Sequence, residues 1–487
     1  MSAGTTEEPF SIYTSREKWL IVSLVALGAL FSPLSANIYF PAIPTIAAAF
    51  HKSIELINLT VTINMVFQGI SPMFWGSWSD TYGRRHAMIL CLLLLTLSCI
   101  GLALTPTKDY WLLLFLRCFQ AAGSASTIAI AAGVIGDIST RAERGGFFGV
   151  YSIGPMFGPA IGPVLGGALA DKLGWRAIFW FLCIGSALCT VVLLLFLPET
   201  LRAIVGNGSI RPHRIYHPVL PVIGRHAVKV DPPPGTTKRR ARLQNPLRLL
   251  LHVDTALLLL INAVVYAVFY SVTASISSVF HDVYAQLNET ELGLCYLTLG
   301  GGLILGTLTY GRVLDWEYER IRKELPAPDP SSKEPVEAFP IEKARLRITP
   351  FLLAAYVGLC IGYGWCIEKR TNIAAPLILL FGVGFVLICI MNSIQTLMLD
   401  LMPTQGSSIT ACNNITRCLL GAGLVSAIQP LIDALNPGWT YVLLGGISAL
   451  MGPIIYLVMR IGPRCRARRI RMAEMAKAKE QREEGVK

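Results

Sequence analysis

The sequence predicts an all-α integral membrane protein in which twelve transmembrane helices form two six-helix bundles. The chain of 487 residues is 53% hydrophobic and 15% charged, with a mean hydropathy of +0.55. Soluble proteins carry about a quarter charged residues, so this composition is typical of a membrane-embedded chain. Twelve apolar runs of about 18–26 residues are each long enough to span a bilayer. A long polar segment divides these runs into six and six.

The spans predict five parts of the chain. These are an N-tail (1–16), a first bundle (17–197), a central loop (198–252), a second bundle (253–460) and a basic C-tail (461–487). A second polar insert, 313–349, separates the eighth and ninth runs. Two repeated bundles of this kind suit a binding cavity between them near the bilayer midplane. The runs lie near 18–40, 55–77, 86–105, 111–136, 146–169, 176–197, 254–280, 291–312, 350–367, 374–400, 408–432 and 439–460.

The distribution of Lys and Arg predicts that both termini are cytosolic. With this orientation 34 of the 42 basic residues lie in inner segments and six lie in outer loops, as expected from the positive-inside rule. Asn288, in an Asn-Glu-Thr sequence of an outer loop, is then a candidate N-glycosylation site. Asn207 has the same pattern but is cytosolic in this topology. The C-tail is expected to be a solvated segment, able to form a helix, that lies near anionic lipid rather than a site for a partner.

A ladder of glycine and proline runs through the fifth span, from Gly154 to Gly167, as GPMFGPAIGPVLGG. In water such residues argue against a helix, at about 1 kcal/mol for each Gly and about 3 for each Pro. In a bilayer the helix persists, because unsatisfied backbone groups are more costly there. Spacing by four residues places the glycines on one face, where a neighbouring helix can approach closely. The ladder therefore predicts a bent, tightly packed helix, and plain packing is the alternative to a functional role.

The loop after the second span contains Gly76, Asp80, Gly83, Arg84 and Arg85. Gly76 permits close helix contact, Gly83 permits a tight turn, and Asp80 can form a charged network with the two arginines. The same spacing recurs after the eighth span at Gly311, Asp315 and Arg320, which indicates an internal repeat. Inner charges with a local counter-ion are the simpler alternative.

These motifs resemble those of the major facilitator superfamily. The loop at Gly76–Arg85 is similar to its signature loop, and the fifth span is similar to its antiporter motif at Gly158, Pro159, Gly162, Pro163, Gly166 and Gly167. Arg117-Cys-Phe-Gln120 resembles a proton-coupling motif of the fourth helix. The stretches FSPLSANIYFPAIP, LPETLRAIVGNGSI, GRVLDWEYER and NNITRCLLGAG are similar to fungal twelve-helix drug/proton antiporters, whose branches include citrate-type and metabolite exporters. The resemblance implies the major facilitator fold, with an inner gate at Asp80, Arg84, Arg85 and Asp137 and a counterpart at Asp315 and Asp400.

Two arginines, Arg117 and Arg417, lie inside predicted spans, whereas no Asp or Glu lies in the interior of any span. An intramembrane Arg is expensive and faces a cavity or a partner by default. The positive field of these two residues favours an anionic or neutral cargo over a cation. A structural Arg that caps backbone carbonyls is the alternative for each. The residue that carries a proton is not identified by this pattern.

Other polar side chains in the spans expected to form the cavity are candidates for cargo contact or for hydrogen bonds between helices, at about 0.6–1 kcal/mol each. We expect about half of them to line the cavity. They are Asn37, Tyr39, Asn64, Gln68, Gln120, Tyr266, Tyr270, Asn392, Gln395, Asn413 and Asn414.

The predicted function is export of a small organic molecule (a drug, toxin or secondary metabolite) by proton antiport, and the alternative is export of a citrate-like organic acid. No paired acids, His cluster or nucleophile–base set occurs at bilayer depth, so the chain is not expected to be an enzyme. No cofactor, metal site or nucleic-acid partner is expected, and no ATP-binding loop is present. The partners expected are the organic substrate, either anionic or neutral, protons and the lipid bilayer, for a monomer in the plasma membrane.

Overall fold

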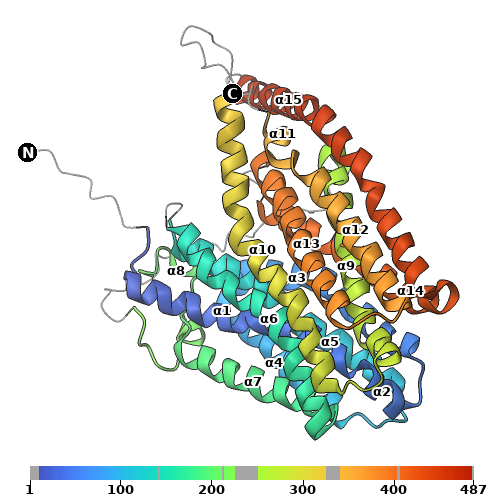
Figure 1. Cartoon of the computed structure of the whole chain (residues 1–487). Helices are drawn as coiled ribbons and strands as arrows, with labels where there is room; N and C mark the ends of the chain where they lie inside the picture. The colour runs from blue at the N-terminus through green and yellow to red at the C-terminus, as the bar shows by residue number, and fades with distance from the viewer. Residues whose placement is uncertain are drawn as a thin grey trace, which may run out of the picture. The chain divides into compact units, whose positions relative to one another are not determined.

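The computed structural model describes residues 10–140, 143–210, 213–224, 250–324, 340–402 and 406–484, and the regular structure among them is helical (Figure 1). Pro232–Pro234 of the central loop and Arg141 lie outside the described residues. Two compact units are present. Unit 1 comprises Met1–Leu243 and Ala274–Gly300, and unit 2 comprises Gln244–Thr273 and Gly301–Lys487.

Unit 1 contains the helices up to α8, together with the C-terminal part of α9 and the N-terminal part of α10. Within it, α1 packs against α5 and α6, and α4 packs against α5 and α7. The helices of the first part of the chain are α1 (Ser15–Asn37), α2 (Ile43–Phe50), α3 (Ile54–Tyr82), α4 (Arg84–Leu104), α5 (Tyr110–Ile138), α6 (Arg144–Leu173), α7 (Arg176–Phe196) and α8 (Arg202–Val205), with short 3-10 turns at Phe40–Ala42 and Arg214–Tyr216.

Unit 2 contains the remaining parts of α9 and α10 and all of the later helices. Within it, α12 packs against α13 and α14. The helices of the second part of the chain are α9 (Val253–Val283), α10 (Glu289–Glu324), α11 (Ile341–Leu346), α12 (Thr349–Glu368), α13 (Ala374–Leu401), α14 (Gly406–Ala449) and α15 (Met451–Glu484).

Eleven helical segments in the described residues are long and apolar enough to cross a membrane. The last of them, Ser408–Arg469, is 62 residues long, about twice the length of most others. It is interrupted at Asn436, whose φ of 61° and ψ of 162° are not helical and which precedes Pro437. The eleventh predicted span lies before this break and the twelfth lies after it. The segment therefore contains two spans, and the twelve-helix fold is confirmed.

Local sequence explains where several of these helices begin and end. Thr14 and Glu17 form a capping box at the start of α1, in which each side chain bonds the backbone N–H of the other. Ser53 caps α3 through the backbone N–H of Leu56. Gly83, with φ of 114°, makes the turn from α3 into α4 that the sequence predicts.

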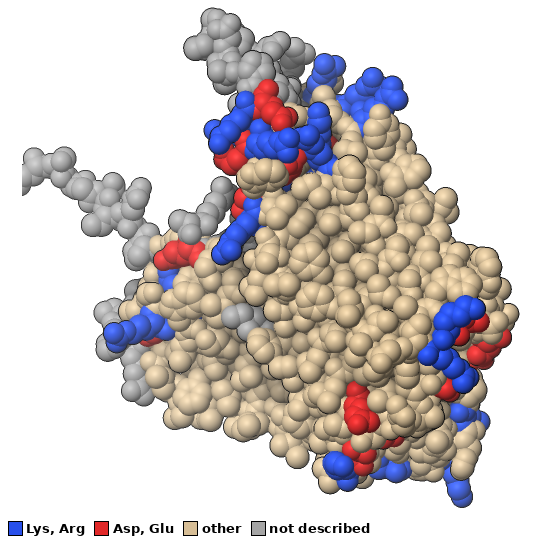
Figure 2. Space-filling view, in the orientation of Figure 1, with Lys and Arg blue, Asp and Glu red and all other residues tan. Residues whose placement is uncertain are grey.

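Two helices extend beyond the predicted spans into the polar segments. α10 continues to Glu324, so part of the insert 313–349 is helical, and α15 continues into the basic tail as far as Glu484. On the face shown in Figure 2, charged side chains gather at the ends of helices, whereas the surface along the middle of the helices is uncharged. This pattern fits helices whose middles face lipid.

Candidate functional site

Arg117 of α5 lies in the interior of unit 1 and is fully buried. Its Nη1 donates to Oε1 of Gln120 at 2.5 Å, and its guanidinium carbon lies 4.2 Å from the ring centre of Tyr39. Asn64 donates to the main-chain oxygen of Arg117 at 3.5 Å. Among the described residues, Nε and Nη2 of Arg117 have no hydrogen-bond partner, and the guanidinium makes no ion pair. A buried cation with unused donors is a natural complement to an anion or to carbonyl oxygens.

Side chains that the sequence did not single out hold this group in place. Thr60 of α3 donates to the hydroxyl oxygen of Tyr39 at 3.0 Å. Nε2 of Gln120 lies 3.6 Å from Sγ of Cys99 in α4. Thr60 lies one helical turn from Asn64, and this spacing on the second span could have marked it. Cys99 gave no signal, because a buried Cys usually behaves as a small apolar residue.

Arg417 of α14 has a similar setting in unit 2. Its Nη2 donates to Oδ1 of Asn414 at 3.0 Å, and its guanidinium carbon lies 4.8 Å from the ring centre of Tyr266. The ring of Tyr270 lies against that of Tyr266, tilted by 35°, with ring centres 4.5 Å apart. The Nε of Arg417 has no hydrogen-bond partner in the described part of the chain. Each unit therefore contains an arginine that lies beside a tyrosine ring, bonds one amide and makes no ion pair with a described carboxylate; Arg117 is fully buried and Arg417 is half-buried.

A chain of amide side chains lies beside Arg417 and links three helices of unit 2. Asn262 of α9 donates to Asn413 of α14 at 2.6 Å, and Asn413 donates to Gln395 of α13 at 2.9 Å. Nε2 of Gln395 lies 3.5 Å from the hydroxyl of Thr410. Asn413 and Gln395 were predicted from the sequence and Asn262 was not, although an Asn in the apolar run of α9 is a usable signal.

The other predicted cavity residues have mixed settings. Asn37 donates to the main-chain oxygen of Pro33 at 2.7 Å within its own helix, and its Cβ lies against Gly162, so its contacts are those of helix packing. Asn392 and Gln68 are half-buried on α13 and α3. Their roles in binding cargo remain predictions.

The predicted gate network of unit 1 centres on Arg84. Its guanidinium pairs with Asp80 at 2.5 Å and with Asp137 of α5 at 3.1 Å, and it donates to the hydroxyl of Ser79 at 2.8 Å. This arrangement ties α3, α4 and α5 together at one end. Arg85 was expected to join the same network but instead donates to main-chain oxygens, including that of Leu194 at 2.9 Å. Successive residues of a helix point in different directions, so only one of the two arginines can face the acids.

Glu199, at the end of the sixth predicted span, was not singled out from the sequence, yet it is buried at the turn between α3 and α4. Its carboxylate accepts main-chain N–H groups of Arg84 at 2.8 Å, Arg85 at 3.3 Å and Leu201 at 3.0 Å. Any side chain at Gly83 would overlap this carboxylate. Glu199 thus caps the N-terminus of α4, where a negative charge is stabilised.

A further ion pair links the start of α1 to the segment before α6. Nζ of Lys18 lies 2.8 Å from the carboxylate of Glu143. The hydrogen bond from Lys18 holds the pKa of Glu143 below its usual range. The Glu143 carboxylate therefore remains charged at neutral pH.

The repeated motif in unit 2 does not form the same network. Asp315 is exposed, and Arg320 pairs with Glu317 at 3.9 Å on its own helix. Asp400 pairs instead with Arg345 of α11 at 2.9 Å. The cation beside Asp400 thus comes from the short helix α11 and not from the repeated motif, and the gating roles of Asp315 and Asp400 stay predictions. Outside its own helix and chain neighbours, no described atom lies within 4 Å of a Cβ placed at Gly76 or at Gly311, so the close contact predicted for Gly76 is not made within unit 1.

The basic tail also departs from expectation. Arg469 of α15 pairs with Asp254 at the start of α9 at 2.8 Å, and Arg466 lies 3.6 Å from Glu342 of α11. Asp254 and Glu342 are 2% and 0% exposed. These two arginines are thus part of the folded unit 2 rather than of a solvated tail.

The fifth predicted span, α6, uses its glycines on two faces. Gly158, Gly162 and Gly166 lie against α1, where added Cβ atoms would meet Pro33, Asn37 and Ile38. In contrast, Gly167 lies against the main chain of Glu289 and Gly293 of α10, within unit 1. The remaining members of the motif, Pro159 and Pro163, are accommodated inside α6. The close packing predicted from the ladder is confirmed, and it joins α6 to two helices.

The Gly167→Ala variant is expected to lose most transport activity. The new Cβ would overlap backbone atoms of α10, and a forced backbone shift costs about 1–3 kcal/mol. Gly149→Ala is the matched control, because Gly149 lies on the same helix and no described atom outside that helix lies within 4 Å of its added Cβ. Transport per molecule at the membrane should be compared, and equal transport by both variants would show that the α6–α10 contact is not needed.

The candidate glycosylation residue, Asn288, is exposed and caps α10. Its Oδ1 accepts the main-chain N–H of Glu291 at 2.8 Å. The hydroxyl of Thr290, in the same tripeptide, donates to Asp171 of α6 at 2.8 Å, and Glu289 accepts the hydroxyl of Thr45 at 2.5 Å. The tripeptide therefore also joins α10 to α2 and α6 within unit 1.

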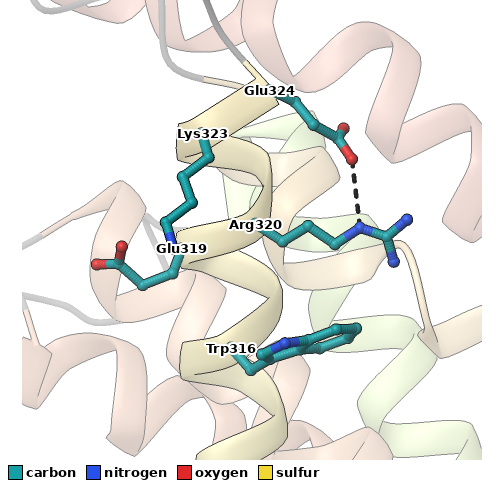
Figure 3. Close-up of a pocket in the computed structure, with 5 residues that line it drawn as sticks. All are labelled: Trp316, Glu319, Arg320, Lys323 and Glu324. Carbon is teal, nitrogen blue, oxygen red and sulfur yellow. Dashed lines mark hydrogen bonds and ion pairs between the residues drawn. The ribbon is translucent and has the colours of Figure 1, made fainter.

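One surface hollow lies at the end of α10 (Figure 3). Arg320 points toward Glu324, with Nε at 3.3 Å from the carboxylate, and lies above the Trp316 ring. The lining comes from a single helix and is exposed, so this hollow is not a candidate for a cargo site. The lining residues are Trp316, Glu319, Arg320, Lys323 and Glu324.

The long apolar helices define the protein as a multi-pass membrane protein. The chain belongs to the major facilitator superfamily, whose family model matches residues 25–426. The resemblance seen in the motifs is thereby confirmed.

Several curated fungal proteins are similar over almost the whole chain. Citrate exporter 1 of Aspergillus niger is 38% identical over 474 residues, covering 95% of this chain and 90% of that protein. The MFS-type transporter tstD of Talaromyces stipitatus is 34% identical, covering 97% and 87%. Multidrug transporter QDR2 of Candida glabrata is 32% identical, covering 96% and 85%.

Solved structures support the fold alone. The human organic anion transporter MFSD10 has a TM-score of 0.58 at 17% identity, covering 91% of this chain and 100% of that one. The xylose transporter XylE from E. coli has a TM-score of 0.62 at 13% identity, covering 91% and 98%.

Proposed function

We propose that this protein is a secondary transporter that exports a small organic anion in exchange for protons. The observation that carries the proposal is Arg117, which is fully buried, has two unused donor nitrogens among the described residues and has no carboxylate partner. Arg417 has a similar setting in unit 2. A cation kept at bilayer depth without a counter-ion is costly, and an anionic cargo would offset that cost when it binds. The printed name of the Aspergillus niger relative agrees with an organic-acid cargo.

Export of an uncharged drug or metabolite is the second candidate. It is favoured by the similarity to the Candida glabrata multidrug transporter and by tyrosines beside both arginines, Tyr39, Tyr266 and Tyr270. Aromatic rings provide a large apolar surface with little conformational entropy to lose. In this case each arginine would contact a carbonyl or hydroxyl oxygen of the cargo.

The proposal includes the wider setting of the protein. The protein catalyses no chemical reaction and acts as a monomer in the plasma membrane. Both of its termini are cytosolic, and Asn288 carries a glycan. The bundles 17–197 and 253–460 alternate access, and the networks at Arg84 and at Asp400 close the inner side. Alternating access of two repeated bundles is the general mechanism of such folds.

The test is efflux from cells that express the chain, loaded in parallel with labelled citrate and with a lipophilic fluorescent drug. Organic-anion efflux that an uncoupler abolishes is the expected result. Efflux of the drug alone would favour the second candidate, and efflux that the uncoupler does not change would contradict proton exchange. Cells expressing Arg117→Ala at the same level are the matched control, because that variant lacks the proposed anion-binding group.

A further inference from the structure

The arginines of α15 fall into two sets with different surroundings. Arg466 and Arg469 pair with the buried acids Glu342 and Asp254. The other set is exposed, and among the described residues its members make no ion pair or hydrogen bond. This set is Arg460, Arg464, Arg468 and Arg471, which we call the arginine face.

The arginine face forms a narrow stripe. At about 100° per residue, its four positions fall within an arc of about 80°. The paired Arg469 lies at least about 100° away from every member of this stripe by the same geometry. Its ion pair of 2.8 Å with Asp254, which is 2% exposed, fixes the rotation of the helix. The fold therefore directs the arginine face outward.

The stripe begins where the last membrane span ends. Tyr456 and Leu457 are 65% and 44% exposed, as expected for residues that face lipid, and Arg460 follows within one turn. The polar headgroup region is about 5–8 Å thick on each side of a bilayer. Arg464 lies about 6 Å along the axis from Arg460, so both fall within this layer. Arg468 lies about 12 Å along, within reach of its surface through a long side chain.

We propose that the arginine face binds anionic phospholipid headgroups of the adjacent leaflet, the cytosolic one in the proposed topology. No Asp or Glu occurs on α15 before Glu474, so no acid of that helix competes for these arginines. Guanidinium groups bind phosphate through paired hydrogen bonds, and an anionic leaflet attracts basic segments beside a span. Continuity with the membrane span favours lipid over a soluble partner. This proposal does not depend on the nature of the cargo.

The test measures lipid selectivity of the full chain reconstituted in phosphatidylcholine vesicles. Spin-labelled phosphatidylserine and spin-labelled phosphatidylcholine are compared for the fraction immobilised by the protein. Wild-type protein is expected to prefer phosphatidylserine, and salt should weaken this preference. One surface arginine contributes a factor of about five to the attraction by an anionic leaflet. The triple variant R464Q/R468Q/R471Q is therefore expected to reduce the preference for phosphatidylserine by at least about fivefold.

The matched control removes three other exposed basic residues of unit 2, as R312Q/K323Q/K343Q. An equal loss in this control would overturn the proposal, because general charge would then explain the preference. An unchanged preference for phosphatidylserine in the R464Q/R468Q/R471Q variant would also overturn the proposal. If that variant kept the lipid preference but lost export in cells, the arginine face would instead contact a protein. Equal melting temperatures of all forms in detergent would show that folding is unchanged.

Discussion

Replacement of Arg417 by alanine is expected to abolish export while the amount of protein at the membrane stays unchanged. Arg417 is bonded to Asn414 and lies beneath Tyr266, and its Nε has no partner among the described residues. Loss of one partner of a buried charged contact costs about 2–5 kcal/mol, or at least about a thirtyfold loss of affinity. The measurement is uncoupler-sensitive efflux per molecule at the cell surface.

Two further variants separate charge from geometry at this position. Arg417→Lys keeps the charge but loses the planar fork of donors, so partial export is expected. Lys52→Ala removes an exposed charge from a predicted outer loop and should export normally. Unchanged export by Arg417→Ala would show that this residue has a structural role only.

Replacement of Arg469 by methionine is expected to destabilise unit 2 strongly. The change would leave Asp254 buried, 2% exposed, and without its cation at 2.8 Å. Removal of one member of a buried ion pair costs about 3–5 kcal/mol, because the remaining charge is uncompensated. The free energy of unfolding in mixed detergent micelles provides the measurement.

A second substitution identifies the cause of this loss. Asp254→Asn in the Arg469→Met background removes the uncompensated charge and should restore most of the stability. Arg471→Met is the matched control on the same helix. Because Arg471 is exposed, its replacement should change the free energy of unfolding by less than about 0.5 kcal/mol. A loss of stability in the control equal to that in Arg469→Met would contradict the role of the ion pair.

Much of the candidate site could be predicted from single residues in apolar runs. Arg117 and Arg417 were identified because a charge at bilayer depth needs a reason. Their neighbours Gln120 and Asn414 were identified as polar side chains in spans expected to form the cavity, and Gln120 also belongs to the motif that resembles a proton-coupling motif. Asn262 and Thr60 were missed, although each is a polar residue in the apolar run of a helix expected to form the cavity.

The choice of ion-pair partners could not be predicted in the same way. Arg84 and Arg85 look equivalent in the sequence, yet only Arg84 meets Asp80 and Asp137. Asp400 meets Arg345 of a short helix inside a polar insert, not the repeated motif at Asp315. A pair forms where two helix ends meet, and this depends on crossing geometry between residues far apart in the chain.

The sequence by itself determined that this protein is a twelve-helix membrane transporter of the major facilitator superfamily, with a glycine-lined fifth span and two intramembrane arginines. These are local properties, since span length, composition and motif spacing are read along one segment at a time. Only the tertiary structure decided that Glu199 caps α4, that the glycines of α6 serve both α1 and α10, and that two tail arginines neutralise buried acids. Those contacts depend on which faces of distant helices pack together, because the direction of each side chain is fixed by its helix and its partner comes from another.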